Sequence, residues 1–174
     1  MPYLKNIVRE VLRLYPPRMS TANAEAYVSN MPAVGFNVRT AIEDTSLPVG
    51  SGSSGSAPVG ILKGTQIIYS VIGMQRRNDI FGADATVFRP ERWESWSPSK
   101  WEYAPFNHGP RVCLGQSFAI SHMRYALCRI FQKYETISLA RPETEQKAMR
   151  LELNIKPASP VICTFRPSGV IAKQ

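Results

Sequence analysis

The stretch FNHGPRVCLG, residues 106–115, limits the possible folds of this chain more than any other feature. It places Cys113 among two glycines, a proline and an arginine, directly before a helical pattern at 116–134. A thiol just before a helix N-terminus lies at the positive end of the helix dipole, which favours the thiolate. Backbone N–H groups in a tight glycine-containing turn can also point at the sulfur. The loop on its own is consistent either with a thiolate ligand or with a free cysteine buried in a turn.

Arg111 lies two residues before Cys113, where it can pair with an anion next to the thiolate. Zinc is a poor alternative, because His108 and Cys113 form the only close pair of zinc-binding residue types and no second close pair follows. Cys128 and Cys163 are expected to be small core residues. Three cysteines without close spacing argue against a disulfide framework and suit a reducing compartment.

The hydrophobic pattern predicts a mixed α/β chain, mainly helical with small β-sheets. Apolar residues at three-four spacing predict amphipathic helices over 4–15 and 116–134, and Pro16 and Pro17 end the first of them. With 174 residues the chain is long enough for one domain with a core. Short strands are expected at 33–42, 65–72, 150–155 and 161–165.

Three other segments have no clear period. Residues 50–60, rich in glycine and serine, are interpreted as a flexible connector. A short helical turn is expected around 74–78. The aromatic-rich and proline-rich stretch 81–105 is expected to be ordered but irregular, since so many aromatic residues would be unusual in a disordered segment.

Glu10 and Arg13 lie three apart on the first predicted helix and can pair on one face. Most such spacings are solvated surface pairs. Here Arg13 stands between Leu12 and Leu14, which favours burial, and a buried pair is costly unless further partners complete it. Arg92, in the stretch FRPERW, is a candidate third partner.

The chain carries 21 Lys and Arg against 13 Asp and Glu, a formal charge of +8. The basic residues are scattered and no nucleic-acid motif is present, so nucleic-acid binding is not expected. The start of the chain does not resemble a signal peptide, and no apolar run approaches the ~20 residues of a membrane span.

Three stretches together, EVLR (10–13), FRPERW (88–93) and FNHGPRVCLG, resemble in order and rough spacing the signature motifs of the cytochrome P-450 family. Residues 63–93 are also similar to the sheet and meander region of that family. The resemblance covers most of residues 1–174 and implies the haem-ligating C-terminal part of a single P-450 domain, an incomplete fold. The stretches LPVG and WEYAPFNHGPRVCLGQSFA are similar to fungal members that hydroxylate alkanes and fatty acids.

The resemblance implies a role for each matching position. Cys113 would be the axial thiolate ligand of the iron in haem b, and Arg111 and Arg39 would bind its propionates. Phe106 would pack beside the sulfur and exclude water. The fixed glycines of the motif are Gly109 and Gly115.

Glu10, Arg13 and Arg92 would then form a buried ion network that braces the meander and the cysteine loop, with a structural role. His108 departs from the motif, since close relatives usually have glycine there. If that position requires a positive φ, histidine costs about 1 kcal/mol or more.

The implied activity is a monooxygenase that inserts one oxygen atom into an apolar substrate, an alkane or fatty acid. Electrons would come from an NADPH-dependent flavoprotein reductase docked on the basic face near the loop. Candidate contacts are Arg124, Arg129 and Lys133, and the alternative is that these residues form an ordinary solvated helix face. The family location is the cytosolic face of the endoplasmic reticulum membrane. The alternative is a non-catalytic haem-binding remnant or truncated gene product, because the oxygen-activating helix, the membrane anchor and most of the substrate pocket of the family are absent.

Residues 18–31, RMSTANAEAYVSNM, are polar and without period. Relatives pass almost directly from the double proline to a stretch like 32–41. The segment is interpreted as an insertion or an unspliced intron, and a genuine surface loop is the alternative.

Overall fold

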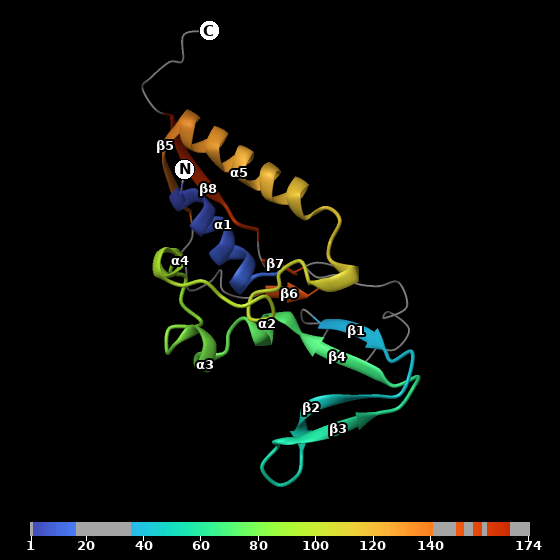
Figure 1. The fold of residues 1–174 in the computed structure, drawn as a ribbon. Helices are drawn as coiled ribbons and strands as arrows, with labels where there is room; N and C mark the ends of the chain where they lie inside the picture. The colour runs from blue at the N-terminus through green and yellow to red at the C-terminus, as the bar shows by residue number, and fades with distance from the viewer. Residues whose placement is uncertain (1, 17–35, 141–148, 152–154, 158–159, 168–174) are drawn as a thin grey trace.

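The computed structural model describes residues 2–16, 36–140, 149–151, 155–157 and 160–167 (Figure 1). The elements are, in chain order, α1 (Pro2–Leu14), β1 (Phe36–Thr40), β2 (Thr45–Ser51), β3 (Ala57–Ile61), β4 (Gln66–Ser70), α2 (Val71–Met74), α3 (Asn78–Phe81), α4 (Arg92–Ser95), the 3₁₀ turn Gly109–Arg111, α5 (Gln116–Lys133), β5 (Tyr134–Leu139), β6 (Met149–Leu151), β7 (Ile155–Pro157) and β8 (Cys163–Pro167). This confirms a mixed α/β architecture with small sheets.

The helix α1 lies at the centre of the described structure, between α5 on one side and α2–α4 on the other (Figure 1). Its apolar stripe buries Val8 and Leu12, which form the core cluster with Phe106 from the cysteine loop. Partly buried residues of α5, among them Ile120, Met123 and Leu127, pack against this cluster. The helices predicted at 4–15 and 116–134 are therefore confirmed, and their mutual packing supports the cysteine loop.

All four sheets are two-stranded and antiparallel within the described residues, with pairings β1–β4, β2–β3, β5–β8 and β6–β7. The predicted strands at 33–42 and 65–72 form the first pair, in which Asn37 lies opposite Tyr69 and Arg39 opposite Ile67. Because this pair continues directly into α2, it connects the region near the cysteine loop to the region around α1.

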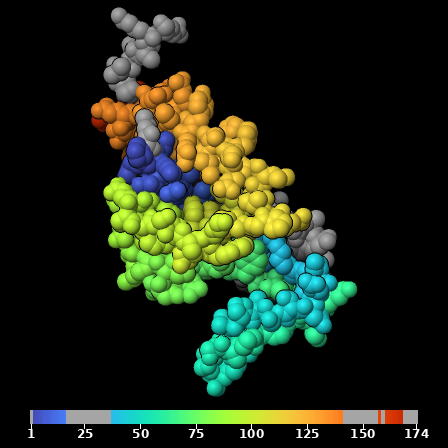
Figure 2. Space-filling view, in the orientation of Figure 1, coloured from blue at the N-terminus to red at the C-terminus, as the bar shows by residue number. Residues whose placement is uncertain are grey.

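Residues 50–60, expected as a flexible connector, instead belong to a β-hairpin that projects from the body of the molecule (Figures 1 and 2). Leu47 pairs with Val59 and Ser51 with Ala57. Three glycines turn the chain with positive φ: Gly50 at 135°, Gly52 at 76° and Gly55 at 68°. The expectation was wrong because a glycine-rich composition is typical of linkers, whereas these glycines form the turns of the hairpin. Their positive φ values are conformations that L side chains rarely adopt.

Several boundaries also differ from the expectations. The strand β5, at residues 134–139, was not expected after α5. The strand predicted at 150–155 is divided into β6 and β7, which pair with each other. The turn expected at 74–78 spans the end of α2 and the start of α3. The proposed insertion at 18–31 lies outside the described residues.

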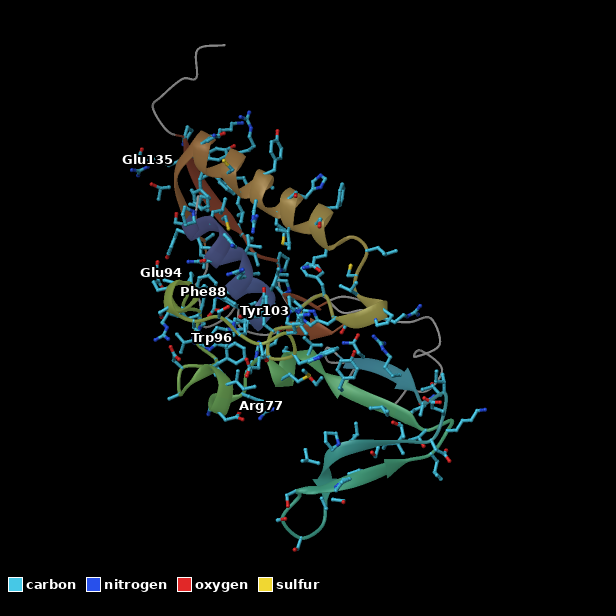
Figure 3. All side chains as sticks on the ribbon, viewed as in Figure 1. Arg77, Phe88, Glu94, Trp96, Tyr103 and Glu135 are labelled. Carbon is cyan, nitrogen blue, oxygen red and sulfur yellow. The ribbon has the colours of Figure 1, made fainter. Side chains whose placement is uncertain are left out.

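The segment 81–105 is irregular but well packed, as the aromatic content predicts. Trp93 is central, with ring centroids 5.4 Å from Trp96 and 4.7 Å from Tyr103. Trp96 also lies 4.8 Å from Phe81, centroid to centroid. Figure 3 shows Tyr103 at the lower end of α1, where its hydroxyl donates to the Arg9 carbonyl at 3.2 Å, and Trp96 below it, toward α3. This aromatic cluster holds the segment against the central helix.

Candidate functional site

The cysteine loop is a tight turn that ends in α5. After the 3₁₀ turn Gly109–Arg111, the Val112 N–H donates to the Gly109 carbonyl at 3.0 Å. The Cys113 N–H donates to the Phe106 carbonyl at 2.9 Å, which closes the loop on itself. The helix α5 begins three residues after the cysteine, so Cys113 lies just before its N-terminus, as the sequence predicts.

Positive φ values in this loop fall on Asn107, at 60°, and Gly109, at 74°. His108 has a φ of −143°, which is extended backbone that any residue adopts. Because strain was expected only with a positive φ, histidine is not strained at this position. The His108 ring instead lies 5.3 Å from Trp101, centroid to centroid, with Nε2 3.1 Å from the Tyr103 carbonyl oxygen.

A cavity of about 440 Å³ opens beside Cys113. Arg111 and Gly115 line it from the loop and Arg39 lines it from β1. Its walls are largely apolar, formed by Val38, Val112 and Leu114. The structure thus brings four sequence-predicted site residues, three from the loop and Arg39 from β1, to one cavity lined by a thiol and two guanidinium groups.

The Arg39 side chain is held in place at the edge of the cavity. Its Nη1 donates to the Val38 carbonyl at 2.8 Å, and its guanidinium lies 5.8 Å from the Tyr69 ring centroid. Arg111, by contrast, is exposed. One cation is therefore preorganised while the other extends into solvent.

Phe106 and Gly109 do not line this cavity. Phe106 is buried in the core cluster with Val8 and Leu12, and Cys113 packs against that cluster. Phe106 therefore shields the side of the cysteine that faces α1 and α5. Gly109 supplies the positive φ with which the 3₁₀ turn begins.

Behind the loop, Glu10 is fully buried at 0% exposure and accepts five hydrogen bonds. Arg13 donates to both of its oxygens, Nε to Oε2 at 2.9 Å and Nη2 to Oε1 at 2.8 Å. Arg92 Nε donates to Oε1 at 3.0 Å. The structure thus brings together the three members of the predicted network.

Two further donors to Glu10 were not identified from the sequence. Trp93 Nε1 donates to Oε2 at 2.9 Å and the backbone N–H of Arg89 donates to Oε1 at 3.0 Å. Burial alone would raise the pKa of Glu10, but the hydrogen bonds from Arg13, Arg89 and Arg92 outweigh it and hold the pKa below its ordinary value. The carboxylate is therefore ionised at neutral pH.

Backbone carbonyls complete the shells of the two buried guanidinium groups. Arg13 donates to Gln75 O at 2.8 Å, to Ala85 O, and to Val87 O at 3.2 Å. Arg92 donates to Phe81 O at 3.1 Å and Asp84 O at 3.0 Å. Because every one of these carbonyls lies between residues 75 and 87, the network fixes that segment on α1.

Two buried polar residues were also missed. Gln75, with 0% exposure, donates to the Leu12 and Arg13 carbonyls and accepts from the Ala104 N–H at 2.8 Å. Asn107 accepts from the Tyr69 hydroxyl at 3.2 Å and donates to Asn37 Oδ1 at 3.2 Å. Only the position of Asn107 inside the loop motif signalled its importance, and nothing in the local sequence distinguished Gln75.

The candidate partner contacts on α5 do not form one exposed set. Arg124 is partly buried, whereas Arg129 and Lys133 are exposed. Arg129 donates to Gln132 at 3.2 Å, and the Lys133 ammonium lies 5.4 Å from the Tyr134 ring centroid. Only the last two remain candidates for an open docking face.

Among the residues that the structure describes, no group of three or more His, Cys, Asp or Glu side chains could hold a metal ion. His122 lies 4.2 Å from Phe118, ring centroid to ring centroid. Cys113, Cys128 and Cys163 are all free and partly buried. The chemistry of the cavity therefore depends on one thiol and two cations.

Comparisons with known proteins show the family to which this chain is similar. The family model described as Cytochrome P450 matches residues 32–163. Cytochrome P450 52E1 of Candida apicola is 42% identical over 157 residues, covering 87% of this chain and 27% of the relative. Cytochrome P450 monooxygenase pvhE of Talaromyces variabilis is 44% identical, covering 79% of the chain and 24% of the relative. Cytochrome P450 52-E3 of Starmerella bombicola is 38% identical, covering 98% of this chain and 29% of the relative. The chain thus spans roughly a quarter of the length of these relatives.

Proposed function

Because this chain belongs to the cytochrome P450 family, we propose that it binds haem b through Cys113 and forms the haem-ligating, C-terminal part of a monooxygenase. One observation carries the proposal: Cys113, Arg111 and Arg39 line the same 440 Å³ cavity, although Arg39 comes from a different element. The apolar walls suit a porphyrin face, the thiol is the ligand type, and two guanidinium groups match two propionates.

Each residue has a distinct task in this proposal. When bound, haem supplies oxygen activation, which thiolate ligation favours. Arg39, held by Val38 and Tyr69, orients one propionate, and Arg111 binds the other. Phe106 keeps water from the buried side of Cys113. Glu10, Arg13 and Arg92 act on the site only by holding the segments that support the loop.

The family membership also supports a wider proposal. The substrate would be apolar, an alkane or fatty acid, and the electrons would come from an NADPH-dependent flavoprotein reductase. The exposed Arg129 and Lys133 on α5 would contact an acidic face of that reductase, so docking would weaken at high ionic strength. The endoplasmic reticulum membrane is the proposed location. No helix in the described part of the chain has the length and apolarity to cross a bilayer.

A second candidate function is haem binding without catalysis. It is favoured by the openness of the cavity, whose described walls come only from residues 37–39 and 110–115. Leu114, one of those walls, is 100% exposed. In this alternative the chain binds haem on one face and does not transfer oxygen.

Haem titration of the 174-residue chain and of Cys113→Ala tests the proposal. The matched control is Cys128→Ala, because Cys128 is also free and partly buried but does not line the cavity. We expect the chain and the control to give the carbon monoxide difference spectrum of thiolate-ligated haem, and Cys113→Ala to lose it. Unchanged haem uptake and spectra in Cys113→Ala would show that another atom holds the iron. Product formation with NADPH and a reductase, by a protein that extends this chain to the length of its relatives, separates the two candidate functions.

We further propose that residues 18–31 are an insertion or an unspliced intron. The polar and aperiodic composition of the segment supports the proposal. Sequencing of the transcript tests it. The intron interpretation fails if most messages retain these codons, and the segment is then a genuine part of the chain.

A further inference from the structure

A second cavity, of about 180 Å³, lies in the seam between α1 and α5 and shares no lining residue with the cysteine cavity. Lys5 and Arg9 line it from α1, and Gln116 and Arg124 line it from α5. Its apolar floor is formed by Val8, Leu12 and Phe106. The polar groups therefore converge over the same core cluster that supports Cys113 from behind.

The charge of this cavity is unbalanced. Lys5, Arg9 and Arg124 line it, and no Asp or Glu does. Lys5 and Arg9 lie four residues apart on one helix face, where like charges repel. None of the three forms an ion pair within the described residues. Among the described residues, the Arg9 guanidinium lies over the Trp93 ring, 5.4 Å from its centroid.

Arg124 adds an independent observation. Its Nε is buried and has no hydrogen-bond partner among the residues that the structure describes. A buried donor on a charged group is costly to leave unpaired. Since the residue lines the cavity, an acceptor placed in the cavity could satisfy this atom.

We propose that this cavity is a binding site for a small divalent oxyanion of the phosphate type. Three cations without a lining carboxylate favour a doubly charged anion over a singly charged one. The Gln116 amide can donate a further hydrogen bond, and the N-terminus of α5 adds positive potential. The bound anion links α1 to α5 and stabilises the fold behind the cysteine loop.

Isothermal titration of the 174-residue chain with sodium phosphate tests the site, at pH 7 and with ionic strength held constant by sodium chloride. We expect one phosphate per chain, and weaker binding of acetate. Arg124→Gln should weaken phosphate binding at least about tenfold, because it removes a charge-assisted hydrogen bond. Arg166→Gln, which removes an exposed arginine on β8, is the matched control and should bind phosphate as the unmodified chain does.

Phosphate should also raise the urea midpoint of the unmodified chain above that in sodium chloride of equal ionic strength, and Arg124→Gln should lose this increase. The exposed Lys5 gives a second variant, Lys5→Gln, which should weaken binding severalfold with an unchanged circular dichroism spectrum. Equal phosphate affinity in the Arg124 and Arg166 variants, or no phosphate-specific heat and no midpoint increase, would overturn the proposal.

Discussion

At the scale of single residues, the structure depends on one buried carboxylate. Glu10 is the only acidic group bonded to both Arg13 and Arg92 among the described contacts, and the carbonyls around those two arginines carry no net charge. Removing the carboxylate would leave Arg13 in the interior without a counter-charge among the described residues, and Arg92 with only the partly exposed Asp84 carboxylate, 3.3 Å from its Nη2. Removal of one partner from a buried pair is far more costly than loss of an exposed pair.

Glu10→Gln should therefore lower the free energy of unfolding by about 3–5 kcal/mol at pH 7, because Arg13 loses its counter-charge and Arg92 keeps only Asp84. Urea denaturation followed by circular dichroism measures the loss. The control is Glu94→Gln at an exposed position of α4, which should change stability by less than about 0.5 kcal/mol. Equal effects in the two variants would contradict the structural role of the network.

The same carboxylate gives the stability a pH dependence of known sign. The pKa of Glu10 in the folded chain lies below its ordinary value of 4.5, so the carboxylate stabilises the fold fully above pH 4.5. This contribution is lost as the pH falls through the folded-state pKa. The difference in unfolding free energy between the unmodified chain and Glu10→Gln should therefore shrink between pH 5 and pH 2, as urea midpoints can show. A difference that stays constant down to pH 2 would contradict this assignment.

Asn107 combines a positive φ of 60° with hydrogen bonds to Tyr69 and Asn37. Asn107→Ala loses both of these hydrogen bonds. It also places alanine in the left-handed region, where its Cβ is strained and it has no polar side chain to stabilise the conformation. Asn107→Gly loses only the bonds. We expect Asn107→Gly to be less destabilised than Asn107→Ala by about 1 kcal/mol in urea denaturation. The reverse order would show that backbone strain does not matter at this position.

At the scale of elements, the sequence predicts what depends on periodicity and misses what depends on pairing. The helices α1 and α5 follow from apolar spacing, and the strands β1 and β4 from short apolar runs. The hairpin β2–β3 was missed because its exposed strands carry little alternation and its glycines resemble a linker. Strand β5 was missed because it continues from α5 without a break, and its partner β8 is distant in sequence.

The candidate site shows the same division. The motifs predicted Cys113 and the Glu10 network because a cysteine in a loop rich in glycine and proline, and a charged pair on an apolar helix, are uncommon. They did not predict Gln75, whose two partner carbonyls on α1 and whose donor Ala104 become neighbours only in the folded chain. Contacts through backbone groups leave little trace in residue identity.

The projecting hairpin allows a prediction for an element. Residues 52–56 form its exposed turn, and the haem-site residues contact neither strand in the described hydrogen bonds. Replacing 52–56 with the two-residue turn Asn-Gly should therefore change the free energy of unfolding by less than about 0.5 kcal/mol and leave haem uptake unchanged. Loss of haem uptake in this variant, measured by the same titration, would show that the hairpin supports the site.

At the scale of the whole molecule, the described structure packs one face of α5 against α1 and leaves apolar side chains exposed elsewhere on α5. The face of α5 that contacts α1 is partly buried, whereas Phe118, Tyr125 and Phe131 on the same helix are more than half exposed. Figure 2 shows α5 forming a long outer edge of the molecule. Leu114, at the mouth of the cysteine cavity, is also fully exposed. Apolar surface of this extent is typical of faces that another element covers.

The exposed apolar surface near the cysteine cavity leads to a prediction about activity. Haem bound to Cys113 would contact walls from residues 37–39 and 110–115, and no other described residue lines this cavity to exclude water. Excluding water from an active site prevents side reactions that compete with productive chemistry. We therefore expect the 174-residue chain, supplied with NADPH, reductase and a fatty acid, to form less than about one product per haem, measured by mass spectrometry. Sustained hydroxylation that Cys113→Ala abolishes and Cys128→Ala preserves would contradict this expectation, because it would show that the 174-residue chain suffices to protect and use the site.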